Sequence, residues 1–200
     1  MKTLSFAILS LVAAGALAGC NTPIETEDTA GPEAARAPAA ARVDLEVEAV
    51  TAMKRLQFKH SGLCIGAAAG VNGSPLVQKD CGSTDATIVF EKEYATSSMS
   101  PPRPPTQFRL RYAVDRSLCV HIGGPSFDDG GLVALYTCDP ARDNQWFNED
   151  PIDAAGFGGI RAVHSDLCLA AFGSLTNVGS SVYQWGTPCS HDWQQIRQYL

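Results

Sequence analysis

Residues 108–147 carry the pattern that decides the fold: FRLRYAVDRSLCVHIGGPSFDDGGLVALYTCDPARDNQWF. The segment opens with apolar and polar residues in alternation, Phe108–Tyr112, which predicts a half-buried strand. A polar turn then leads to a Leu-Cys-Val step around Cys119, and a Gly-Gly pair precedes a second apolar run that ends near Cys138. The segment closes on the aromatic pair Trp146-Phe147. Short apolar runs separated by turn residues predict strands paired as hairpins.

The same pattern occurs on both sides of this segment. The Leu-Cys-aliphatic step recurs at Leu63-Cys64-Ile65 and at Leu167-Cys168-Leu169, so a unit of about 50 residues is present three times. Two further strand candidates precede the turns, and one strand candidate in each unit follows a glycine-bearing loop. These segments are Arg55–Phe58, Ile160–Val163, Leu76–Lys79, Leu132–Tyr136 and Ser181–Trp185. We expect an all-β domain over residues 51–200, with repeats at about 51–106, 107–156 and 157–200.

Six of the seven cysteines fall into these units as neighbouring pairs with nearly equal separations. Pairing within each repeat is the natural disulfide assignment, although six cysteines permit fifteen connectivities. The expected disulfides are Cys64-Cys81, Cys119-Cys138 and Cys168-Cys189. Without a C-x-x-C motif or a closely spaced Cys/His quartet, the sequence predicts no metal site and no cofactor.

The first 50 residues have a different character. A basic start and an uncharged apolar run, Leu4 to Leu17, predict a secretory signal peptide over residues 1–19, too short to span a membrane. Leu17-Ala18-Gly19-Cys20 resembles the lipobox of bacterial lipoproteins, which implies acylation of Cys20 and a lipid anchor. Asn21 after the cysteine implies the outer membrane as the destination. The alternative is an ordinary signal peptide cleaved nearby, which leaves a free thiol.

Residues 20–50 are rich in Ala, Pro, Thr and Glu and predict a flexible tether, although the alternation in Val43–Glu48 also allows a leading strand. The formal net charge of the whole chain is −6. An acidic chain without a basic surface is a poor partner for nucleic acid.

The three units resemble the ricin-type β-trefoil lectin domain. The resemblance rests on the Leu-Cys-aliphatic step, the strand before the second cysteine and a polar-x-Trp ending, usually Gln-x-Trp in that family. We assign this ending to Asn144-Gln145-Trp146, His191-Asp192-Trp193 and, without a tryptophan, Thr87-Ile88-Val89. The resemblance implies a six-stranded barrel capped by three hairpins, with Trp146 and Trp193 in the shared core.

The resemblance also implies where a sugar binds, because an aromatic ring stacks on the sugar and neighbouring polar side chains bond its hydroxyls. The implied residues are His121, Tyr136, Asp143 and Asn144 in the second repeat, and Gln184 and Trp185 in the third. Lys79 replaces the aromatic residue in the first repeat, which predicts an inactive site there. Galactose-binding members usually carry Asp two residues after the first cysteine, where this chain has Gly66, His121 and Ala170. Asp128 or Asp129 could enter the second site from the following loop.

No catalytic motif is present, since the sequence lacks H-E-x-x-H, G-x-S-x-G and a Walker loop. The proline cluster Pro101–Pro105 predicts a stiff excursion between the first two repeats, or a partner-docking motif. We therefore expect a non-enzymatic, membrane-anchored lectin of the bacterial outer membrane that binds glycans or glycoconjugates. The alternative is a protein-interaction module that resembles the binding subunits of cytolethal distending toxins.

Overall fold

The computed structural model describes residues 51–124, 126–186 and 188–200. The predicted signal peptide, Cys20, the predicted tether and the alternative strand at Val43–Glu48 lie outside these described residues. Within the described part, no helix is long and apolar enough to span a membrane.

The described residues form an all-β domain with three short 3-10 helices. In chain order the strands are β1 (Thr51–Phe58), β2 (Cys64–Ala67), β3 (Leu76–Lys79), β4 (Phe90–Tyr94), β5 (Phe108–Tyr112), β6 (Leu118–Ile122), β7 (Val133–Thr137), β8 (Phe147–Glu149), β9 (Phe157–Ala162), β10 (Cys168–Ala171), β11 (Val182–Trp185) and β12 (Gln195–Tyr199). The 3-10 helices are η1 (Ala86–Ile88), η2 (Asp143–Gln145) and η3 (Phe172–Ser174).

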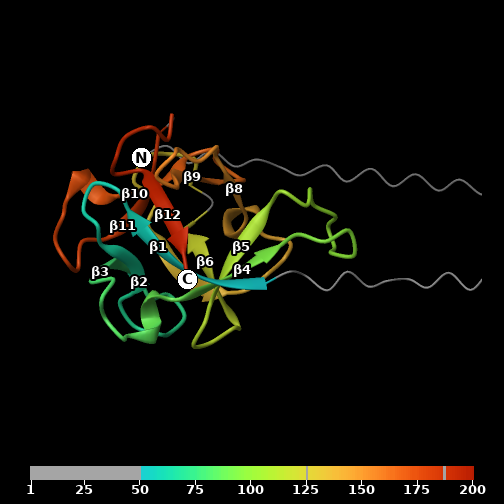
Figure 1. The fold of residues 1–200 in the computed structure, drawn as a ribbon. Coiled ribbons are helices and arrows are strands. Elements are labelled where there is room, and N and C mark those ends of the chain that lie inside the picture. Colours follow the sequence, from blue (N-terminus) through green and yellow to red (C-terminus); the bar gives the residue numbers. More distant parts are fainter. Residues whose placement is uncertain (1–50, 125, 187) are drawn as a thin grey trace, which may run out of the picture. The chain divides into compact units, whose positions relative to one another are not determined.

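Six strands close into a barrel (Figure 1). Going round it, β1 pairs with β4, β4 with β5, β5 with β8, β8 with β9, β9 with β12, and β12 with β1, all antiparallel. Closure satisfies the backbone groups that an open sheet would leave at its edges. The barrel interior is filled by large apolar side chains, among them Phe58, Phe90 and Phe147, each fully buried.

Three hairpins, β2–β3, β6–β7 and β10–β11, cap the barrel and pair with one another. In each hairpin, the loop that joins its two strands makes two main-chain hydrogen bonds to a strand of a neighbouring hairpin. The residues that both donate and accept in these bonds are Gln78, Leu135 and Gln184. The loops contain Gly73, Gly130 and Gly179, at which φ lies between +83° and +89°. Only glycine adopts this conformation readily, so these three glycines fix how the hairpins meet.

Each repeat contains one disulfide, between Cys64 and Cys81, Cys119 and Cys138, and Cys168 and Cys189. Their Cα atoms are 5.0, 5.0 and 5.6 Å apart, within the usual range for disulfides. The predicted all-β class, the three repeats and the pairing within repeats are confirmed.

Candidate functional site

The backbone pairing identifies equivalent positions in the three repeats. The amides of Ala113, Val163 and Lys59 donate to the carbonyls of Val89, Trp146 and Gln195 respectively. It follows that Thr87, Asn144 and Trp193 are equivalent, two residues earlier in each repeat. The hairpin register likewise places Lys79, Tyr136 and Trp185 opposite the first cysteine of their repeats.

This equivalence corrects the predicted polar-x-Trp motif. The matching segments are Ile88-Val89-Phe90, Gln145-Trp146-Phe147 and Gln194-Gln195-Ile196, so the prediction is one residue too early in the first two repeats and three in the third. Phe90, Phe147 and Ile196 fill the barrel core, whereas Trp193 only packs against it. Trp146 is fully buried beneath η2, outside this core cluster.

The second repeat has an open pocket that brings together three of the predicted residues, His121, Tyr136 and Asn144. Its volume is about 380 Å³, and its walls also include Ala134, Arg142 and three glycines. Tyr136 is 38% exposed, and its ring stacks on the imidazole of His121, with ring centroids 4.9 Å apart. Asn144 is buried and donates through Nδ2 to the carbonyl of Ile122 at 2.9 Å.

His121 is an uncharged side chain in this pocket at neutral pH. Burial lowers its pKa to about 4, and the positive charges of Arg142 and His164 contribute to this shift. His121 Nε2 lies 3.4 Å from Asn144 Nδ2, and His121 Nδ1 is buried without a protein partner among the described residues. The position that carries Asp in galactose-binding relatives therefore offers a neutral imidazole.

A second pocket of about 400 Å³ adjoins the first and shares Arg142 and Asn144 with it. Its other walls are Phe127, Asp143 and His164. Phe127 is 67% exposed. Asp143 Oδ1 pairs with Arg103 at 2.5 Å, and the side chain of Asp143 is 59% exposed, so Asp143 is at the site with one carboxylate oxygen engaged. Neither Asp128 nor Asp129 lines either pocket.

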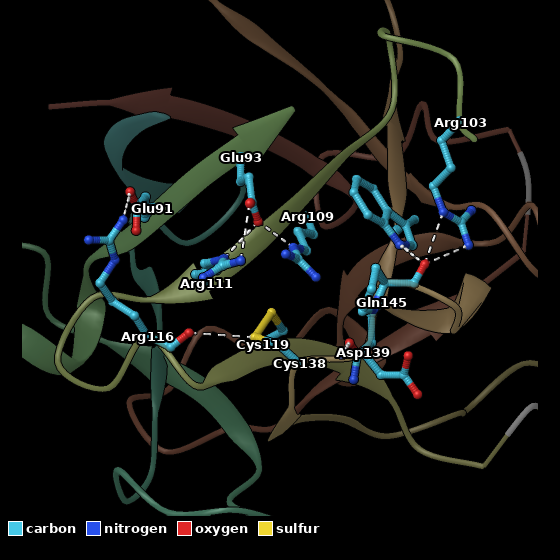
Figure 2. Close-up of polar contacts among 12 residues, drawn as sticks. Glu91, Glu93, Arg103, Arg109, Arg111, Arg116, Cys119, Cys138, Asp139 and Gln145 are labelled. Carbon is cyan, nitrogen blue, oxygen red and sulfur yellow. Dashed lines mark hydrogen bonds and ion pairs between the residues drawn. A yellow bond between two sulfur atoms is a disulfide. The ribbon is translucent and has the colours of Figure 1, made fainter. Parts of the chain in front are cut away.

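A buried layer behind η2 holds this part of the site in place (Figure 2). Arg103, from the proline-rich connection between β4 and β5, donates to the carbonyl of Pro140, which also accepts from Trp146 Nε1. The Arg103 guanidinium lies 4.9 Å from the centroid of the Trp146 ring. The amide of Gln145 joins η2 to the preceding strand by accepting from the Asp139 amide and donating to the carbonyl of Thr137. The proline-rich segment thus contacts, through Arg103, the chain segment that carries Arg142 and Asn144.

The third repeat is built differently from the second. Trp193 stands at the position of Asn144, and its ring meets that of Trp185 edge to face, with centroids 6.1 Å apart. The imidazole of His191 also stacks on the Trp193 ring, with centroids 5.4 Å apart. The third repeat therefore presents two indole rings and no amide at the equivalent of Asn144.

Gln184 does not face a ligand, and its predicted hydroxyl-binding role needs correction. Its side chain is fully buried, and its Nε2 donates to the carbonyls of Ser126 and Asp128 at 2.8 and 2.9 Å. Its Oε1 accepts from Ser165. Gln184 therefore fixes the loop that carries Phe127, and acts on the second pocket only through that loop.

The first repeat has its equivalent site filled by its own side chains. Lys79 donates to Asp85 and Thr87 at 2.9 and 2.6 Å. A Cβ on Gly66, the equivalent of His121, would lie 2.8 Å from Lys79 Cδ. The side chain of Lys79 therefore occupies the space that the second repeat leaves open.

A six-stranded barrel capped by three hairpins, with an open pocket beside one hairpin in the described part of the chain, defines a β-trefoil. Residues 52–196 match the family model of the ricin-type beta-trefoil lectin domain, and the chain belongs to this family. The domain is generally a non-enzymatic carbohydrate-binding fold, found also as a module of some glycosidases. A comparison with curated protein sequences finds none that matches this chain.

Solved structures agree on the fold. The designed three-fold symmetric protein ThreeFoil is 20% identical, with a TM-score of 0.62 over 73% of this chain and 96% of its own. An exo-beta-1,3-galactanase from Clostridium thermocellum is 17% identical, with a TM-score of 0.63 over 74% of this chain and 30% of its own. The Haemophilus ducreyi cytolethal distending toxin is 15% identical, with a TM-score of 0.56 over 72% of this chain and 81% of the matched toxin chain. At these identities the likeness concerns the fold alone.

Proposed function

We propose that this protein is a non-enzymatic, membrane-anchored lectin whose principal glycan site is the pocket of the second repeat. The observation that carries the proposal is the half-open ring of Tyr136 beside the polar groups of His121 and Asn144 in one pocket. The apolar face of a sugar stacks on an aromatic ring, and directional hydrogen bonds then select its hydroxyls. Asn144 Oδ1 makes no hydrogen bond to the described residues and is the natural acceptor for a hydroxyl.

Trp185 provides a second, weaker site in the third repeat. Its ring is partly exposed, so a sugar can stack on it. Because Trp193 replaces the amide of Asn144, this site has fewer groups to bond hydroxyls and discriminates less between sugars.

The test is a glycan array probed with the full-length protein purified from membranes in detergent, in wild-type form and as three variants. Tyr136→Ala removes the ring and should abolish the main signal, whereas Tyr136→Phe keeps the ring and should retain most of it. Trp185→Ala should weaken binding only modestly. A folded, disulfide-bonded wild-type protein that binds nothing on the array would refute the proposal.

The membrane anchor is a separate part of the proposal and rests on the sequence Leu17-Ala18-Gly19-Cys20. Acyl chains on Cys20 would hold the domain at the outer membrane, where bacterial glycans and host glycans are both within reach. Intact-mass measurement of the protein from membranes tests this, because acylation adds the mass of the lipid and Cys20→Ser removes it. An unmodified protein that begins elsewhere would refute the anchor and leave the lectin proposal standing.

A protein-binding role is the second candidate, favoured by the partly exposed rings of the third repeat. Trp185, Trp193 and His191 form one aromatic cluster, and aromatic residues are enriched at protein interfaces. A toxin-binding subunit is one form of this role. This role would be favoured if a protein encoded by an adjacent gene co-purifies with wild type but not with Trp185→Ala, and if wild type binds nothing on the glycan array.

A further inference from the structure

We infer that the glycan bound by the second repeat is acidic, and that Arg142 binds its carboxylate. This inference deepens the proposed function and rests on it. It names the chemical class of the ligand, which neither the fold nor the family match specifies.

The charges on the pocket walls are the first argument. Arg142 is the only formally charged residue among those that line the first pocket, where His121 is neutral. In the second pocket, the one acidic side chain is Asp143, which is paired with Arg103. Both pockets therefore present the Arg142 guanidinium, and the two carboxylates nearest to it, Asp139 and Asp143, are each paired with an arginine.

The position of Arg142 is the second argument. Arg142 lines both pockets, so it can bind the carboxylate of a sugar whose ring lies in either pocket. Its guanidinium carbon lies 5.7 Å from the centroid of the Tyr136 ring. Because this guanidinium lies over the Tyr136 ring and His121 stacks on the same ring, a sugar packs against the part of the ring that stays exposed and brings a carboxylate on its own ring, or on the adjacent sugar, close to the guanidinium.

The hydrogen bonding of Arg142 is the third argument. Its Nε donates to Asp139 at 3.1 Å, which orients the planar group, while its two terminal nitrogens make no hydrogen bond to the described residues. Its side chain is half exposed. Two free N–H groups on an oriented guanidinium match the two oxygens of a carboxylate, a geometry that lysine does not provide.

The experiment uses the full-length protein in detergent and pairs of ligands that differ only in charge: oligogalacturonate against its methyl ester, and sialyllactose against lactose. Wild type should bind at least one acidic member about tenfold or more tighter than its neutral counterpart. Arg142→Gln should abolish this preference, and Arg142→Lys should restore part of it. Lys59→Gln, which removes the same charge at an exposed ion pair outside both pockets, should keep the preference unchanged.

The outcomes separate the inference from the proposed function. If wild type binds both members of every pair equally, or prefers the neutral ones, the ligand is not acidic and the inference fails while the lectin proposal stands. If Arg142→Gln keeps the acidic preference in a folded protein, Arg142 is not the carboxylate site. If wild type binds no glycan of either kind, the inference and the lectin proposal fail together.

Discussion

Replacing Glu93 with glutamine tests the buried ion cluster on the outer face of β4 and β5. Glu93 Oε2 accepts from Nε of both Arg109 and Arg111, and Glu93 Oε1 accepts from Arg111 Nη2 at 3.1 Å (Figure 2). The side chains of Glu93 and Arg109 are 10% and 6% exposed, and that of Arg111 is 25% exposed. Glu93→Gln keeps the shape of the side chain and removes the negative charge that contacts both guanidinium groups.

The expected loss follows from this burial. Breaking a buried ion pair by neutralising one partner costs about 3–5 kcal/mol, because the remaining charge stays out of water. Water reaches Arg111, so the lower end of that range applies, and we expect the free energy of unfolding to fall by about 3 kcal/mol. For a domain of this size, this corresponds to a decrease in Tm of roughly 6–12 °C.

The pH dependence of the same variant supplies an independent check. Burial by itself would raise the pKa of Glu93, but hydrogen bonds from Arg109 and Arg111 offset this and hold the pKa below its ordinary value. The stabilisation is therefore complete above the unfolded-state pKa of about 4.3 and is lost as the pH falls through the lower folded-state pKa. The difference between wild type and Glu93→Gln should shrink in acid.

Urea unfolding at pH 7 and at several pH values below 5 measures both effects. Lys59→Gln is the control, because it breaks an exposed pair with Asp153 and should change the free energy of unfolding by less than about 1 kcal/mol. A loss in Glu93→Gln no larger than that in the control, or a loss that does not change with pH, would refute this account of the cluster.

Three further predictions concern Arg103 next to the site, the disulfide of the second repeat and the protonation of His121. Arg103→Gln should lower the free energy of unfolding by about 2 kcal/mol and speed amide hydrogen exchange in residues 141–146, because Arg103 bonds the carbonyl of Pro140 and stacks on a buried ring; unchanged exchange would contradict this. Replacing Cys119 and Cys138 together by serine should cost about 3 kcal/mol in urea unfolding, on the loop-entropy model, and a loss below about 1 kcal/mol would contradict it. Because the pKa of His121 is lowered to about 4, glycan affinity measured by calorimetry should not change between pH 5.5 and 8, and a change of affinity in either direction between pH 7 and 6 would contradict this.

The strands and repeats were predictable because they depend on short-range signals. Alternating apolar residues, glycine-bearing turns and paired cysteines recur in each unit, and β3 and β5 begin and end at the predicted residues. Local periodicity determines these elements, since one face of each strand has to be buried.

The core motif was predicted in the wrong register for a related reason. Trp146 and Trp193 are the conspicuous aromatics after the second cysteines, but Phe147 and Ile196 fill the barrel. In the second repeat, sequence alone does not show which of the adjacent residues Trp146 and Phe147 points into the core, because a shift of one residue turns a strand residue to the opposite face. In the third repeat the prediction chose Trp193, although the core residue lies three positions later.

Part of the site depended on contacts between repeats and was missed. The second pocket joins Phe127 and Arg142 of the second repeat to His164 of the third. Gln184 looked like a binding residue beside an aromatic ring, yet its amide holds the loop that carries Phe127. A basic residue after the second cysteine, found here only as Arg142 in the second repeat, was the one signal in the sequence that could have indicated the cation.

The all-β class, the three repeats and the cysteine pairs could be predicted from the sequence, because each follows from patterns within about 50 residues of chain. Lys79 already predicted a closed first site, but the tertiary structure was needed to show that its side chain fills that site, that Trp193 replaces the amide in the third repeat, and that Tyr136 stays partly exposed in the second. The physical reason is that a pocket is the space left over after packing. That space depends on side chains that the barrel and hairpins bring together from separate parts of the chain.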